Sequence, residues 1–219
     1  MLKLLIKFIV GVLVTPVAFA VSIAFYRNIL LVSELATHLH LFVWGMVSYV
    51  VLHLLFYKPT YCYVLGHEAF HAGVAWLFGG RIKSFKVSDE GGSVATDKSN
   101  VVIELSPYFV PIYAIIISVI YFVIASSYNI DSSVFVFLIA FMLTFHIVST
   151  IEIMKIRQPD IVKSGYFFSI IMVYVLNIVI ISMIFSLLFP SFTAKNFFMD
   201  SWRVSINVYN GIINQLFFK

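Results

Sequence analysis

Long apolar segments alternate with short polar connections along this chain. Five of these segments contain no Asp, Glu, Lys or Arg: residues 8–26, 39–57, 105–130, 132–151 and 164–194. Each is at or near the roughly 20 residues that an α-helix needs to cross a bilayer. A sixth apolar segment, residues 61–79, is interrupted only by His67, Glu68 and His71. The pattern predicts an all-α membrane protein with six transmembrane helices, at about residues 4–26, 39–57, 61–79, 103–126, 132–154 and 164–189.

Composition supports this interpretation. Hydrophobic residues make up 62% of the 219 residues and charged residues 11%, whereas about 25% of the residues in an average soluble domain are charged. We therefore expect a single polytopic membrane domain over residues 1–219. The first 20 residues also imitate a secretory signal, with Lys3, Lys7 and a small-residue site at Ala18–Ala20. The apolar run continues to Tyr26, which is longer than a typical signal core and favours an uncleaved helix.

The longest polar insertion, residues 79–100, follows the third predicted span. Apolar and polar residues alternate before a turn-forming Asp89–Gly92 segment, and Ser93–Thr96 then has strand-like composition. This pattern predicts a short β-hairpin or re-entrant loop, although a flexible loop would have a similar composition. Pro107 and Pro111 predict a kinked start to the next span.

The C-terminal segment, at about residues 196–217, has apolar residues at helical spacing. They are Phe198, Trp202, Ile206, Tyr209, Ile213 and Leu216. This spacing predicts an amphipathic helix that lies on the membrane surface.

The most informative motif is His67-Glu68-x-x-His71 in the third span. Histidines four residues apart lie on one face of a helix, so both can direct a ring nitrogen at one metal ion. Glu68 is next to them and can accept a proton from a water molecule whose pKa zinc lowers towards ~7. Helix packing is the structural alternative, but ionisable groups at membrane depth are costly and usually functional.

Around this motif the sequence resembles the site-2 protease family of intramembrane zinc metalloproteases. The resemblance rests on Leu65-Gly66-His67-Glu68-Ala69-Phe70-His71-Ala72, on Phe78-Gly79-Gly80-Arg81 and on Gly91-Gly92-Ser93-Val94. It covers residues 61–125 best and residues 140–175 more loosely. It implies one Zn²⁺ per chain, His67 and His71 as ligands, Glu68 as general base and a re-entrant β-element after the zinc helix. It also implies that the substrates are transmembrane segments of other proteins.

The third zinc ligand departs from the family pattern. Family members use an aspartate in a Leu-Asp-Gly motif, and the nearest match here is Gln158-Pro159-Asp160-Ile161. The family's upstream asparagine and proline pair is also missing. We favour Asp160 as the third ligand, with Glu152 and His146 as alternatives. His146 also shares a polar helix face with Ser149 and Thr150, which suits hydrogen bonding between helices.

The remaining polar residues have simpler interpretations. Glu104 is interpreted as a solvated or helix-capping acid at a membrane boundary, and His53 as a packing or interfacial residue. The single cysteine, Cys62, excludes an internal disulfide. The net charge of +4 suits a surface facing anionic lipid and nothing resembles a nucleic-acid groove.

The distribution of positive charge predicts the orientation. Eight of the 14 Lys and Arg residues fall after the first, third and fifth spans, and six lie on the opposite side. The positive-inside rule therefore favours active-site loops on the cytoplasmic side. We expect the membrane to be a bacterial cytoplasmic membrane.

Taken together, these features predict an intramembrane zinc metalloendopeptidase that hydrolyses peptide bonds in or near transmembrane segments. Gly91, Gly92, Ser93 and Val94 are the predicted substrate-binding residues, because an open strand edge can hold an unwound substrate. The partners are a membrane-protein substrate and the lipid bilayer, without nucleic acid. Two other functions fit the same motif, namely a metal-ion transporter and a catalytically inactive relative that binds membrane segments.

Overall fold

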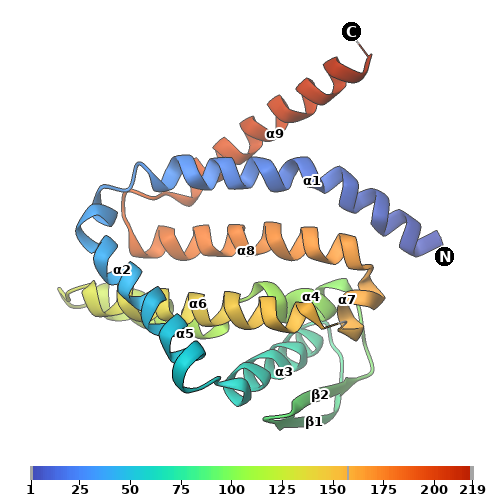
Figure 1. The fold of residues 1–219 in the computed structure, drawn as a ribbon, viewed down its shortest axis with the longest axis horizontal. Coiled ribbons are helices and arrows are strands. Elements are labelled where there is room, and N and C mark those ends of the chain that lie inside the picture. The colour runs from blue at the N-terminus through green and yellow to red at the C-terminus, as the bar shows by residue number, and fades with distance from the viewer. Residues whose placement is uncertain (1, 157, 218–219) are drawn as a thin grey trace. The chain divides into compact units, whose positions relative to one another are not determined.

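The structure, a computed structural model, describes residues 2–156 and 158–217, except for the side chains of residues 34–36. The described chain is mostly helical, with one two-stranded sheet (Figure 1). It divides into two compact units, one formed by Met1–Thr37 and Gly165–Lys219 and the other by His38–Ser164.

Among the described residues, four helices are long and apolar enough to cross a membrane. They are α1 (Leu2–Ile29), the helix Thr37–Phe56, α6 (Ser133–Lys155) and α8 (Tyr166–Leu188). The second of these combines most of α2 (Ser33–Val51) with the π-helical turn η1 (Leu52–Phe56). α4 (Val101–Phe109) and α5 (Ile112–Ala125) form a bent pair that would make a fifth.

The prediction of six spans is therefore supported for four helices, or for five if the bent pair counts as one span. α3 (Thr60–Leu77), which carries the His-Glu-x-x-His motif, falls outside this group. The kink predicted from Pro107 and Pro111 is confirmed, because α4 and α5 meet at an angle of 69° across a break at Val110 and Pro111. Pro107 lies inside α4, so the break itself is at the second proline.

In the first unit, α1 packs against α8 and against the C-terminal helix α9 (Ala194–Phe217). Phe8 faces Phe167 and Phe25 faces Phe185, at ring-centroid distances of 5.5 and 5.6 Å, so α1 and α8 run in the same direction (Figure 1). Asn28 donates a hydrogen bond of 2.9 Å to Asp200, which ties the end of α1 to α9.

The helix predicted at about residues 196–217 is confirmed as α9. Of the apolar residues that predicted it, five have exposed side chains: Phe198, Trp202, Ile206, Ile213 and Leu216. Val204 and Phe197 on α9 are buried. One side of the helix thus packs against the rest of its unit, while another side presents apolar surface.

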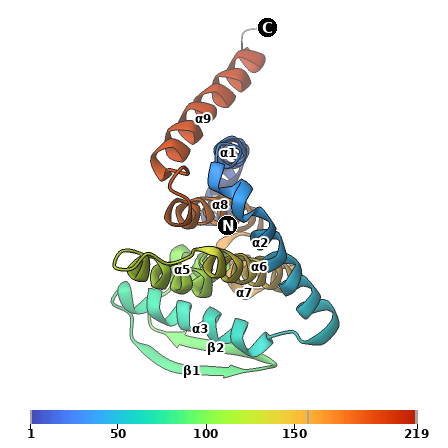
Figure 2. The ribbon, with the colours of Figure 1, turned by 90° about the vertical axis from the view of Figure 1, so that its left-hand side faces the viewer.

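In the second unit, α3 lies between a β-hairpin and the layer that α5 and α6 form (Figure 2). The buried side chains of α3 recur at three- and four-residue spacing: Val64, His67, Glu68, His71, Ala72, Val74 and Ala75. Polar and apolar side chains therefore share the buried face of this helix. At its start, the Tyr113 hydroxyl on α5 donates a hydrogen bond of 2.6 Å to the Cys62 carbonyl, and the Cys62 side chain is exposed.

The hairpin predicted within residues 79–100 is confirmed as β1 (Ile82–Ser88) and β2 (Gly91–Thr96). The strands pair antiparallel, from Ser88 opposite Gly91 at the turn to Ile82 opposite Thr96 at the base. α3 ends directly before β1 because Gly79 adopts a left-handed conformation (φ 72°), and Gly80 N–H then reaches back to the Ala75 carbonyl at 2.8 Å.

Two contacts fix the base of the hairpin, and the first of them ties it to the end of α3. Lys98 donates a hydrogen bond of 2.8 Å to the Phe78 carbonyl, where the helix leaves its last carbonyls without partners. Asp97 accepts a hydrogen bond of 2.7 Å from the Arg81 N–H, and this bond lowers the pKa of the Asp97 carboxyl. The hairpin is thus attached at its base to the helix that carries the candidate site.

Candidate metal centre

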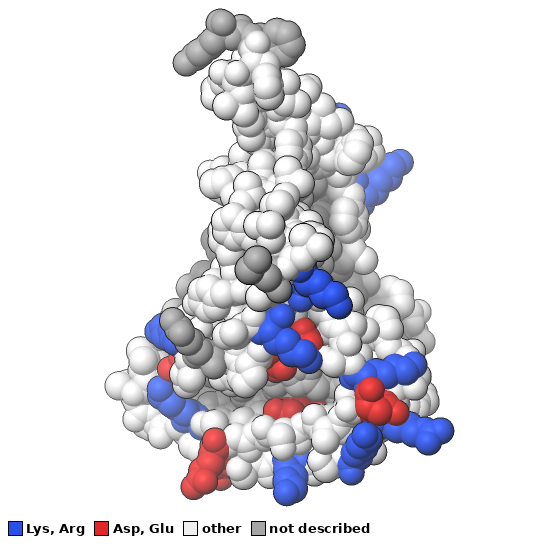
Figure 3. All heavy atoms as spheres, turned by 90° about the vertical axis from the view of Figure 1, so that its right-hand side faces the viewer, with Lys and Arg blue, Asp and Glu red and all other residues white. Residues whose placement is uncertain are grey.

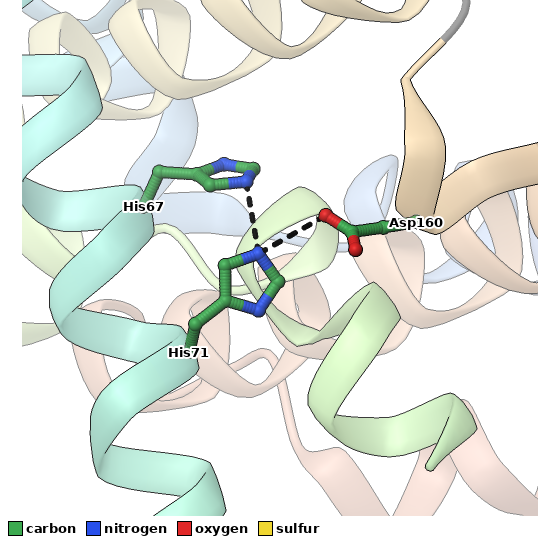
Figure 4. Close-up of side chains that lie close together, drawn as sticks. All are labelled: His67, His71 and Asp160. Carbon is green, nitrogen blue, oxygen red and sulfur yellow. Dashed lines mark hydrogen bonds and ion pairs between the residues drawn. The ribbon is translucent and has the colours of Figure 1, made fainter. Parts of the chain in front are cut away.

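The structure brings His67, His71 and Asp160 together (Figure 4). The histidines are one turn apart on α3, and their Nε2 atoms are 3.2 Å apart. Asp160 comes from the short helix α7 (Pro159–Ser164), and its Oδ2 lies 3.4 Å from His71 Nε2. One ligand atom from each of the three residues lies within 4.8 Å of the other two. Two imidazoles and one carboxylate form a donor set that zinc commonly uses.

Hydrogen bonding determines which nitrogen of His71 faces this cluster. His71 Nδ1 lies 2.7 Å from the Ile103 carbonyl oxygen, which can only accept, so Nδ1 carries a proton and donates. In the neutral ring, Nε2 then presents a lone pair towards the Asp160 carboxylate, which is also an acceptor. Two acceptors at this distance need a positive centre near them, either a proton or a metal ion. A backbone carbonyl on the far ring nitrogen is also the usual outer partner of a metal-bound histidine.

Glu68 is on the same buried face of α3. Its residue is 8% exposed, the same as His67, and His71 is 9% exposed. Gly92 of β2 lies directly against it, because a Cβ atom at position 92 would be 2.6 Å from Glu68 Cγ and 2.7 Å from Val64 Cγ1. Only a glycine lets the strand come this close to the candidate general base.

A pocket of about 790 Å³ opens onto the cluster. Its walls include His67, Glu68, His71 and Asp160, together with the β2 segment 91–96. Figure 3 shows a hollow with acidic side chains inside it. The four predicted substrate-binding residues, Gly91, Gly92, Ser93 and Val94, all line the pocket.

The two alternative third ligands do not join this group. Glu152 accepts a hydrogen bond of 2.9 Å from Lys58 and lies 3.1 Å from His53 Nε2. His146 is buried on α6. In the described part of the chain, the group of ligand atoms that converges with His67 and His71 contains Asp160 and neither of these residues.

The interpretation of Glu104 as a solvated or capping acid is wrong. The residue is 6% exposed and is held by Lys163, Ser99 and Ser164, while Asn100 caps α4 by accepting from Ile103 N–H at 2.9 Å. His53 is buried, as expected of a packing residue, but it also lines the pocket and contacts Glu152.

The sequence contained only weak signals for these contacts. An acid at the edge of an apolar segment and a histidine outside any metal spacing are each compatible with many environments. The Ile103 carbonyl could not be identified from the sequence, because a backbone acceptor has no residue-specific signal.

Comparison with known proteins adds nothing to this geometry, since no family model, no curated protein and no solved structure matches the chain.

Proposed function

We propose that this protein is an intramembrane zinc metalloendopeptidase that hydrolyses peptide bonds in or near transmembrane segments of other proteins. The observation that carries the proposal is the convergence of His67, His71 and Asp160, with ligand atoms within 4.8 Å of one another, beside Glu68 in a strand-walled pocket. The donor atoms fit Zn²⁺ in kind and number, and a metal ion would satisfy the opposed acceptors of His71 and Asp160.

Each residue then has a defined task. His67, His71 and Asp160 hold one Zn²⁺ per chain, and the Ile103 carbonyl orients the His71 ring. When bound, zinc polarises the peptide carbonyl and acidifies a water molecule. Glu68 accepts the proton of the attacking water and returns it to the leaving amine.

Substrate binding follows from the position of β2. A transmembrane helix hides its peptide bonds, so cleavage requires local unwinding, and an open strand edge can pair with the unwound segment. Residues 91–94 line the pocket, and Gly92 packs against Glu68, so a segment paired here would pass the general base.

A proline in β2 tests this mode of binding. Successive N–H groups of a strand point to opposite sides, so one of the variants Val94→Pro and Ala95→Pro removes a donor from the open edge and the other removes one that faces β1. We expect the open-edge variant to lower cleavage about fivefold or more, because one backbone hydrogen bond contributes about 1 kcal/mol. Cleavage of a membrane-inserted substrate and zinc content would be measured for both. Wild-type cleavage by both variants would exclude pairing along this edge.

We also propose that the chain spans a bacterial cytoplasmic membrane six times, with α3 as a polar span and the hairpin loops on the cytoplasmic side. The four or five long apolar helices support the membrane location. The protected setting of α3, between the hairpin and other helices, supports its placement at membrane depth (Figure 2).

Metal analysis combined with a cleavage assay tests the proposed function. We expect protein purified in detergent to contain about one zinc per chain, in line with a single site of three protein ligands. A chelator should abolish cleavage of a membrane-inserted test substrate, and added Zn²⁺ should restore it. Cleavage that persists in fully metal-free protein would contradict the proposal. Zinc-loaded protein that transports the ion without cleaving would favour the transporter.

A further inference from the structure

Glu104 is a buried acid outside the metal cluster, and it contacts the helix that carries Asp160. Lys163 Nζ lies 2.7 Å from its Oε1, and the Ser164 hydroxyl donates to Oε2. Both residues belong to α7, whose first turn contains Asp160. Ser99 Oγ donates a further hydrogen bond of 2.6 Å to Glu104 Oε1 and accepts one of 2.7 Å from Lys163. The carboxylate thus joins the start of α4 to α7 through several charge-assisted hydrogen bonds.

The same turn of α4 also holds a histidine of the cluster. The Ile103 carbonyl accepts from His71 Nδ1, and Glu104 is the next residue along the chain. Asn100 caps this turn and fixes its backbone. A single capped helical turn therefore contacts both elements that supply ligands: α3 through the Ile103 carbonyl and α7 through the Glu104 side chain.

The negative charge of Glu104 should also favour binding of a cation by Asp160. Lys163 is three residues after Asp160 on α7, so its ammonium group lies on the same side of that helix as the ligand. Glu104 neutralises this ammonium at short range. Without the carboxylate, the Lys163 ammonium would lose its ion pair with Glu104 and would compete more strongly with a divalent cation for Asp160.

We propose that Glu104 is a positioning residue of the metal centre, which holds α7 where Asp160 can reach the ion together with His67 and His71. The inference rests on the proposed zinc site, although Glu104 itself does not contact that site. It predicts that the effect of Glu104 on zinc affinity passes through Asp160.

Zinc affinity measured by chelator competition on the full chain in detergent tests this directly. Glu104→Gln should weaken zinc binding by about 10–100-fold, the usual effect of removing an outer partner of a metal ligand. In an Asp160→Asn background, the same substitution should cause little further loss, because the ligand that it positions is already gone. A purely structural role would instead lower the affinity by the same factor in both backgrounds.

The controls separate this inference from the proposed function. Glu152→Gln removes another acid from the pocket wall without touching α7 and should keep wild-type affinity. Ser164→Ala removes one hydrogen bond from the buried face of α7, and it should weaken zinc binding even if Glu104→Gln fails to fold. If Asp160→Asn weakens binding but Glu104→Gln and Ser164→Ala do not, the positioning role is overturned while the zinc site stands. If Asp160→Asn also binds zinc normally, both assignments are overturned.

Discussion

Replacing Glu68 with glutamine should leave zinc bound and lower peptide cleavage by about 10²–10⁴-fold, the usual contribution of a general base. The amide has nearly the same shape as the carboxylate, so the packing against Gly92 is retained. It cannot accept a proton from water, and the chemical step should therefore fail while the metal site remains intact. Zinc content and cleavage of a membrane-inserted substrate, measured on the same preparation, would check both parts.

Glu90→Gln is a matched control for this variant. Glu90 also lines the pocket but lies at the hairpin turn between β1 and β2, so the change removes one negative charge without touching α3. We expect this variant to cleave at close to the wild-type rate. Near-normal cleavage by Glu68→Gln would refute the general-base role, and loss of zinc in that variant would identify Glu68 as a ligand.

Replacing Asp160 with asparagine should weaken zinc binding by more than the 10–100-fold that is typical for an outer partner of a ligand. Two histidines alone leave zinc short of the three protein ligands of a catalytic site. The variant also removes the only charged ligand of the proposed set, so cleavage should fall with zinc occupancy. Chelator competition gives the affinity, and an excess of Zn²⁺ should partly restore cleavage.

The rival ligands provide the comparison. Glu152→Gln and His146→Ala should both retain zinc affinity, because neither residue belongs to the converging group in the described chain. If either variant loses zinc while Asp160→Asn keeps it, the third ligand has been misassigned and the two histidines would still stand as ligands.

Much of the helical fold could be predicted from the sequence because bilayer-length apolar runs have few alternatives. α1, α6 and α8 coincide closely with predicted spans, and Asp89–Gly92 marked the hairpin turn. The sequence also placed an irregularity near Pro111, where the ring removes a backbone donor. The sequence did not show that η1 would extend α2 as a π-helical turn, since the change from α-helical to π-helical hydrogen bonding has no distinct residue pattern.

The part of the candidate site whose residues are close together in the sequence could be predicted. His67 and His71 share one helix, so their spacing alone places them one turn apart. Asp160 was chosen among three possible residues, and only the three-dimensional packing of α7 brings it to His71. The contact between Glu104 and Ser164 joins residues 60 positions apart, and no linear spacing indicates it. Glu104 is buried where α7 packs against it, so its burial could not be predicted from the sequence either.

Cys62 is a site for specific chemical labelling of this protein. It is the only thiol in the chain, it is exposed, and it lies near the start of the helix that carries His67 and His71. The Tyr113 hydrogen bond uses its backbone carbonyl, so chemical modification of sulfur leaves that contact intact. A fluorophore or nitroxide attached there would report on the environment of α3 without prior removal of other cysteines.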